Sequence, residues 1–210
     1  MNAATQKITL QGEAGLIEAL LDLPAAQPRG TVVIAHPHPL FGGTMTNKVV
    51  QTLARAWVQT GWRAVRFNFR GVGASAGAYD EGRGEVADML AVIRQVAPEG
   101  PLAVAGFSFG AFVTSHVVAR LAPRQPEKIV LVGTAASRFE VAPIAPELHE
   151  RTLVLHGEQD DTVTLSSVMD WARPQFLPVT VIPGVEHFFH GQLPLLKSLV
   201  VRHLLAPTSV

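Results

Sequence analysis

The chain has 210 residues, of which 48% are hydrophobic and 16% charged, and its formal net charge is zero. A chain of this size fits one large core, so we treat residues 1–210 as a single domain. Because its charges balance, there is no basic field to attract nucleic acid or an anionic membrane. The absence of cysteine excludes disulfides, thiolate metal sites and a cysteine nucleophile.

The N-terminal stretch MNAATQKITLQGEAG lacks the basic start and apolar core of a signal peptide. No apolar run approaches the roughly 20 residues that are needed to span a membrane. We therefore expect a cytoplasmic protein without a membrane partner.

Apolar, β-branched runs alternate with amphipathic stretches along the chain. Strands are predicted at Ile8–Leu10, Leu16–Leu21, Thr31–Ala35, Ala64–Asn68, Leu102–Ala105, Ile129–Val132, Thr152–His156 and Val179–Ile182. Helices are predicted at Thr46–Thr60, Glu85–Val96, Ala111–Leu121, Leu165–Arg173 and Leu193–Leu204. The first two strands read as an antiparallel hairpin, and the later ones are continuously apolar, as in a sheet covered on both faces. The alternation predicts an α/β domain with a mostly parallel sheet of about eight strands.

Polar side chains follow most of the predicted strands at their carboxyl ends. They are His36 and His38 after the third strand, Arg70 after the fourth, Ser108 after the fifth, Asp160 after the seventh and His187 after the eighth. In sheets of this kind ligands bind at the carboxyl ends of the strands. The pattern therefore predicts a functional site at this edge.

The sequence GFSFG, between a predicted strand and a predicted helix, fits the Gly-x-Ser-x-Gly pattern of a nucleophile elbow. In such a tight turn Gly106 and Gly110 must be small to avoid the neighbouring strand and helix. Ser108 would be held in a strained conformation with its hydroxyl above the sheet. A glycine-rich turn with an incidental serine is the alternative, but the strand–helix context favours a nucleophile.

A serine hydroxyl needs a base to take its proton. Five histidines follow Ser108: His149, His156, His187, His190 and His203. In this class of fold the order is serine, acid, histidine, which disfavours the two before the acidic loop, and the last lies late in the final helix. The loop PGVEHFFHG places His187 just after the last strand, so His187 is preferred. His190 is the nearest competitor, and its alternative is a solvent-facing role.

The acid should lie between the seventh strand and that histidine. The loop LVLHGEQDDTV offers two adjacent carboxylates, and the spacing Gly-x-x-Asp-x-x-Val from Gly157 to Val163 selects Asp160. Asp161 would then cap the following helix or face water, and Glu158 is a weaker candidate. An acid at this place orients the imidazole and stabilises the imidazolium.

The motifs GFSFGA, HGEQDDTV and GVEHFF together resemble the α/β-hydrolase superfamily along nearly the whole chain. The stretches AHPHPLFGGTMTNKVV and FNFRGVGASAGAYDEGRGEVADM resemble small bacterial serine hydrolases without a lid, described as carboxylesterases or dienelactone-hydrolase-like proteins. The resemblance implies an α/β-hydrolase fold with helices on both faces and no lid domain. It implies a serine hydrolase that cleaves a small ester through an acyl-enzyme on Ser108. An amidase, peptidase or thioesterase of the same fold, or a non-catalytic binding protein, is the alternative.

The resemblance also points to an oxyanion hole. One donor should be the backbone N–H of Phe109, directly after the nucleophile. The second should come from the loop after the third strand, where many relatives carry His-Gly and this chain carries His-Pro-His-Pro. Proline has no N–H, so the amide of His38 is the first choice and that of Leu40 the second.

We expect no cofactor and no metal. His36 and His38 lack a third ligand nearby, and the glycines after Arg70 fit neither dinucleotide nor phosphate-loop spacing, so with Arg70 they should shape a turn beside the active site. The expected partner is a small-molecule ester, and a homodimer stays open.

The segment GTAASRFEVAPIAPELHE between the sixth and seventh strands is too short for a helical lid. We therefore expect an open cleft above Ser108, bordered by Leu40, Phe41, Phe107 or Phe109, that prefers short acyl groups.

Overall fold

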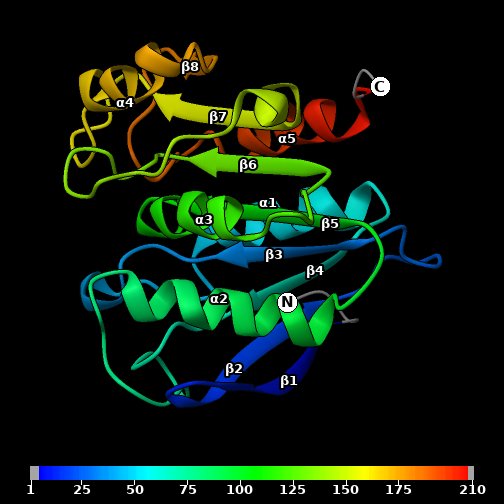
Figure 1. Cartoon of the computed structure of the whole chain (residues 1–210). Coiled ribbons are helices and arrows are strands. Elements are labelled where there is room, and N and C mark those ends of the chain that lie inside the picture. The colour runs from blue at the N-terminus through cyan, green and yellow to red at the C-terminus, as the bar shows by residue number, and fades with distance from the viewer. Residues whose placement is uncertain (1–4, 208–210) are drawn as a thin grey trace.

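The computed structural model describes residues 5–207, and eight strands form one sheet in it (Figure 1). The strands are β1 (Thr5–Gly12), β2 (Gly15–Asp22), β3 (Thr31–Ala35), β4 (Arg63–Phe67), β5 (Leu102–Phe107), β6 (Lys128–Val132), β7 (Thr152–Gly157) and β8 (Val179–Ile182). The helices are α1 (Lys48–Gln59), α2 (Arg83–Val96), α3 (Phe109–Arg120), α4 (Leu165–Ala172) and α5 (Leu193–Leu205). Short 3-10 helices are η1 (Pro39–Phe41), η2 (Pro146–Arg151) and η3 (Arg173–Gln175). Every predicted strand and helix is present, with ends shifted by a few residues.

The sheet has the order β1-β2-β4-β3-β5-β6-β7-β8. The six strands from β4 to β8 in this order run parallel. Nearly all side chains of these strands are buried, except in the edge strand β8. The hairpin of β1 and β2 joins them antiparallel along β4. The expected mostly parallel sheet with an N-terminal antiparallel pair is thereby confirmed.

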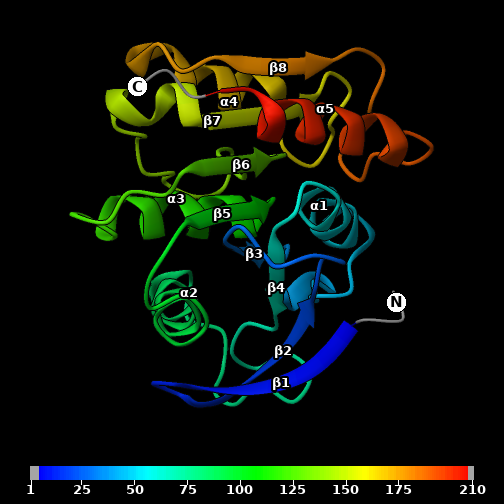
Figure 2. The same ribbon diagram turned by 90° about the vertical axis from the view of Figure 1, so that its right-hand side faces the viewer.

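Helices cover both faces of the sheet, and Figure 2 shows α2 and α3 on one side with α1 and α5 on the other. Successive residues of a strand point to opposite faces, so both faces of the central strands must be apolar. Along β3, Val33 packs with α2 and α3, whereas Val32 and Ile34 pack with α1 and α5. This double burial explains why the strands read as unbroken apolar runs in the sequence.

The connection from β6 to β7 contains only the short helix η2, and no α-helical lid stands between these strands. The carboxyl ends of the central strands are thus left without a helical cap. Among the described residues no helix is both long and apolar enough to cross a bilayer.

Candidate active site

Ser108 forms the turn between β5 and α3, with φ of 57° and ψ of −116°. This backbone region is costly for a residue with a side chain, so the surrounding structure holds Ser108 there. The glycines make the turn fit: a side chain on Gly106 would overlap the carbonyl of Gly110, and one on Gly110 would overlap the carbonyl of Ala35 in β3. The serine is thereby raised over the carboxyl edge of the sheet, as its sequence context predicts.

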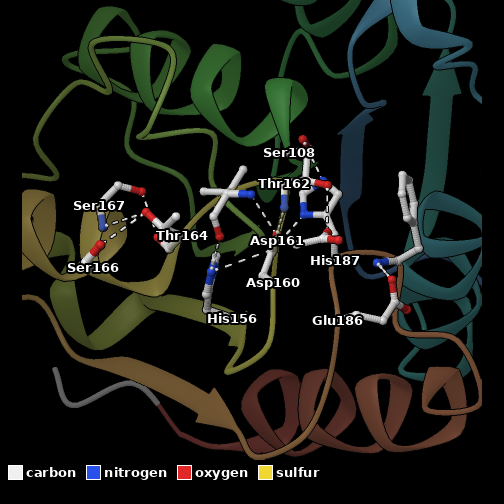
Figure 3. Close-up of polar contacts among 12 residues, drawn as sticks. Ser108, His156, Asp160, Asp161, Thr162, Thr164, Ser166, Ser167, Glu186 and His187 are labelled. Carbon is white, nitrogen blue, oxygen red and sulfur yellow. Dashed lines mark hydrogen bonds and ion pairs between the residues drawn. The ribbon is translucent and has the colours of Figure 1, made fainter.

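Three side chains from different loops meet above this edge (Figure 3). The ring nitrogen Nε2 of His187 lies 3.0 Å from Ser108 Oγ and can accept its proton. The other nitrogen, Nδ1, donates to Asp160 Oδ2 at 2.6 Å. Both His187 and Asp160 are buried, which shields this chain of hydrogen bonds from water.

The carboxylate of Asp160 is held by its own loop. Its Oδ1 accepts hydrogen bonds from the N–H groups of Thr162 (3.0 Å) and Val163 (2.7 Å), leaving Oδ2 for His187. Asp161 faces solvent and touches only the Thr162 hydroxyl at 3.3 Å. Asp161 was expected either to cap the following helix or to face water, and it faces water.

The other acidic candidate, Glu158, is also exposed, and it accepts a hydrogen bond from the Gly184 N–H at 2.9 Å. The helix α4 that follows the acidic loop is capped by the side chain of Thr164 rather than by a carboxylate. Among the described residues, the hydrogen bonds of the His187 ring go to Ser108 and Asp160, and neither Glu158 nor Thr164 takes part in them.

A second buried histidine supports the acidic loop from below. His156 Nε2 donates to the carbonyl of Val163 at 3.0 Å and lies 3.6 Å from Asp160 Oδ2. Burial lowers the pKa of His156, although the charge of Asp160 opposes this, so the ring is neutral near pH 7. His156 thus fixes the turn whose amide holds Asp160, and it does not compete for the serine.

The loop after β8 presents His187 at the required height. Glu186 accepts hydrogen bonds from the N–H groups of Phe188 (2.9 Å) and His190 (2.6 Å), which closes a turn around His187. Partial burial opposes ionisation of Glu186, but these N–H groups lower its pKa below the usual range. The ring of Phe107 lies beneath the imidazole, with centroids 5.0 Å apart. His190 itself is exposed and pairs with Glu186 at 3.0 Å. It therefore has the solvent-facing role that the sequence analysis gave as its alternative.

Two backbone N–H groups are available beside Ser108. The amides of Phe109 and His38 have no hydrogen-bond acceptor among the described residues, and both residues line the cavity at Ser108. The amide of Leu40, by contrast, donates to Nδ1 of the His38 ring at 3.2 Å. The side chain of His38 therefore occupies the second-choice donor and leaves its own amide free.

The cavity at Ser108 has a volume of about 310 Å³. Its lining comes mainly from the loops after β3, β5, β6, β7 and β8, and consists of Pro37, His38, Phe41, Gly42, Gly43, Asn47, Ser108, Phe109, Ala135, Arg138, Phe139, Thr162, Val163, His187 and Phe188. Phe41 and Phe109 border it as expected. Leu40 and Phe107 do not, because Leu40 points to solvent and Phe107 is buried under the imidazole.

His36 and Arg70, which the sequence places at the carboxyl edge of the sheet, do not line the cavity and have structural roles. The buried His36 donates from Nδ1 to the carbonyl of Pro37 at 2.6 Å and accepts the Phe69 N–H at 3.1 Å. Burial lowers its pKa to about 4, so His36 is a neutral brace between loops. Arg70 pairs with Asp88 of α2 at 2.8 Å and does not line the cavity. The described residues contain no group of three or more His, Cys, Asp or Glu side chains that could hold a metal.

Comparison with known proteins identifies the family. Residues 26–153, more than half of the chain, match the model of a hydrolase family described as serine aminopeptidase S33. The chain belongs to this family. As an S33 hydrolase of the α/β-hydrolase superfamily, it shares its fold with a lidless serine hydrolase of Xanthomonas campestris, at 34% identity, a TM-score of 0.87 and coverage of 100% of this chain and 99% of that one.

Two further relatives cover most of this S33 hydrolase. An α/β serine hydrolase homologue from Coxiella burnetii is 37% identical over 96% of this chain and 97% of its own, with a TM-score of 0.81. An uncharacterised protein of Rickettsia prowazekii is 30% identical over 199 residues, which cover 87% of this chain and 82% of the relative.

Glu186, Arg138 and Phe139 are among the residues of the S33 hydrolase's site that the sequence did not predict. Glu186 stands next to His187, and its spacing to the following N–H groups is a local turn signal that could have found it. Arg138 and Phe139 lie in the segment after β6, which reads only as too short for a lid. No motif marks these two residues.

Proposed function

We propose that this protein is a carboxylesterase-like serine hydrolase, with Ser108 as nucleophile, His187 as base and Asp160 as the acid that orients it. The observation that carries the proposal is the unbroken chain of hydrogen bonds from Ser108 Oγ through both nitrogens of His187 to Asp160, at 3.0 and 2.6 Å. A serine is otherwise a weak nucleophile, and this arrangement activates it.

Each step follows from an atom in the site. Ser108 Oγ attacks the ester carbon while its proton moves to Nε2 of His187, and Asp160 stabilises the resulting imidazolium. The negative oxygen of the tetrahedral intermediate accepts hydrogen bonds from the free N–H groups of Phe109 and His38. Losing one such donor typically costs about 3–4 kcal/mol of transition-state stabilisation.

The intermediate then collapses to an acyl-enzyme. Its carbon–oxygen bond to the alcohol breaks, and the alcohol leaves with the proton of His187. Water, deprotonated by the same histidine, attacks the acyl carbon and releases the carboxylic acid and a regenerated Ser108.

The cavity favours a small ester as substrate. A cavity of about 310 Å³ that no helical lid covers is too small and too open to enclose a long acyl chain. An aminopeptidase would need a carboxylate to bind the free ammonium group of its substrate, and no Asp or Glu is among the residues that line the cavity. These two features support ester cleavage over the aminopeptidase activity for which the family is named.

The proposal is tested with p-nitrophenyl esters from acetyl to palmitoyl, matched thioesters and aminoacyl p-nitroanilides, with Ser108→Ala as the blank. The highest kcat/KM should fall on short oxygen esters, with no increase when the substrate forms micelles. A steady rise toward palmitoyl with a jump at the interface, or a preference for aminoacyl anilides, would contradict it. Absence of any turnover would favour the non-catalytic binding protein.

A further inference from the structure

One cation stands in the lining of the cleft without a carboxylate beside it. Arg138 lies in the segment after β6 and lines the same cavity as Ser108 and His187. No Asp or Glu belongs to that lining, and the carboxylate of Asp160 is buried beneath it. The only side chain of the lining with a permanent charge is therefore positive.

The guanidinium of Arg138 lies over the ring of Phe41 but pairs with no carboxylate in the described part of the chain. Within residues 5–207 it makes no ion pair and no side-chain hydrogen bond, and its Cζ lies 5.8 Å from the ring centre of Phe41. Arg66 and Arg70, in contrast, each bind a carboxylate at 2.8 Å. A guanidinium carries a rigid fork of N–H donors that matches a carboxylate, so Arg138 has its full binding capacity left for a ligand.

Arg138 also acts on the loop that carries the second oxyanion amide. Burial lowers the pKa of His38, and the charge of Arg138 lowers it further. The ring of His38 is thus neutral near pH 7, and its Nδ1 accepts the Leu40 N–H. Because Arg138 and Ser108 line the same cavity, a substrate bound at Ser108 can lie close to the positive charge of Arg138.

We propose that Arg138 binds a carboxylate of the substrate, so that the preferred substrates are short esters that carry a negative charge. This inference rests on the proposed esterase function and names its substrate class. The apolar part of such a substrate would lie against the rings of Phe41, Phe139 and Phe188, which form the aromatic wall of the cavity. The carboxylate would lie at the guanidinium, and the ester carbonyl at Ser108.

The kinetic test uses two matched pairs of substrates, one with the charge on the alcohol side and one with the charge on the acyl side. The pairs are 4-acetoxybenzoate with 4-acetoxybenzamide, and mono-p-nitrophenyl glutarate with its methyl ester. The measured quantity is the ratio of kcat/KM for the anionic to the neutral member. Wild type should prefer the anion of at least one pair, and the ratio should fall about three- to tenfold in Arg138→Gln.

Two controls separate binding from general charge effects. Arg94→Gln removes the same charge from an exposed place on α2 outside the cavity, and it should leave the ratio unchanged. Added salt should lower the preference of wild type but not that of Arg138→Gln, because an exposed charge is screened. If the ratio is the same in wild type and Arg138→Gln for both pairs, the guanidinium only covers Phe41 and the inference is wrong.

A binding measurement decides the inference even if no ester is cleaved. Calorimetry on Ser108→Ala protein compares phenylacetate with phenylacetamide, and then repeats both titrations with Arg138→Gln added. The acid should bind more tightly than the amide, and this difference should disappear in the double variant. Equal affinity for both ligands in Ser108→Ala would overturn the inference, whereas absence of turnover with the anion preference intact would overturn only the esterase proposal.

Discussion

Two neighbouring regions at the carboxyl edge of the sheet use their polar residues in opposite ways. The loop after β4 uses them to bind neighbouring elements of the fold: Arg70 pairs with Asp88 of α2 at 2.8 Å, and Asn68 donates to Glu18 of β2 at 2.9 Å. In the loops after β3 and β5, the amides of His38 and Phe109 stay without an acceptor among the described residues and face a cavity. Both regions are rich in polar and glycine residues, so position at a strand end does not by itself indicate a site.

The polar groups that stabilise the fold and the polar groups that are available for chemistry therefore lie in different loops. Paired polar groups in the β4 loop contribute to the free energy of unfolding, since a buried carboxylate or guanidinium is costly without a partner. The region around Ser108 instead carries a strained φ of 57° and donors without acceptors. Such costs are expected where a structure is organised to stabilise a transition state rather than its own fold.

The largest expected effect on activity comes from replacing Ser108 or His187. Ser108→Ala and His187→Ala should each lower kcat by about 10⁴- to 10⁶-fold, because the proton transfer needs both residues and removing either one abolishes it. Thermal unfolding should be nearly unchanged for Ser108→Ala. His190→Ala, which removes an exposed ring, is the matched control and should keep most of the activity. An inactive His190→Ala beside an active His187→Ala would mean that the base is misassigned.

The adjacent carboxylates provide the next effect. Asp160→Asn should lower kcat by about 10⁴-fold, because an amide can stabilise the wrong tautomer of His187 and cannot compensate its charge. Asp161→Asn should have a small effect, since that side chain faces solvent. Steady-state kinetics on both variants checks this. Equal losses would show that the turn, rather than one carboxylate, carries the effect.

The β4 loop should respond in stability rather than in activity. Asp88→Asn leaves Arg70 without its charged partner and should lower the free energy of unfolding by about 2 kcal/mol, less than for a fully buried pair because Arg70 is partly exposed. The kcat/KM of the folded protein should stay near wild type. Asp170→Asn, which breaks the exposed pair with Arg173, is the control and should change little in urea unfolding. A large loss of activity without a loss of stability would place this loop in the site.

A smaller effect appears in the dependence of stability on pH. Burial lowers the pKa of His36 to about 4, against about 6.5 in an unfolded chain. Between these values the unfolded state binds more protons, so the free energy of unfolding should fall as the pH drops, by at most about 1.4 kcal/mol per pH unit from this residue. Urea unfolding at pH 7 and pH 5 measures the slope. His36→Gln should be less stable at pH 7 but show a shallower slope, and an equally steep slope would assign the effect to other groups.

Much of the fold and the core of the site could be predicted from the sequence. Strands buried on both faces leave unbroken apolar runs, and Ser108, Asp160 and His187 each stand in a short motif at a strand end. The task of Arg70 could not be predicted, because its partner Asp88 lies on a helix that contacts the loop only after folding. The choice between the His38 and Leu40 amides depends on a ring nitrogen whose direction no local pattern specifies.

The same limit applies to the walls of the cleft. The sequence predicts Phe107 at the border, but it is the last residue of β5, and the alternation of the strand turns its ring beneath His187. Arg138 lies in an irregular segment where neither periodicity nor a motif indicates which side chain faces the cavity. Side-chain direction in such loops is decided by packing between distant parts of the chain.

The most direct test of the central claim is covalent labelling with a fluorophosphonate, followed by peptide mapping. An activated serine beside two free amides should displace fluoride and form a phosphonyl adduct on Ser108, and His187→Ala should react far more slowly. A single adduct on the peptide that contains Ser108 is the expected result. No adduct in the folded wild-type protein, or an adduct on another residue at the same rate in Ser108→Ala, would contradict the account.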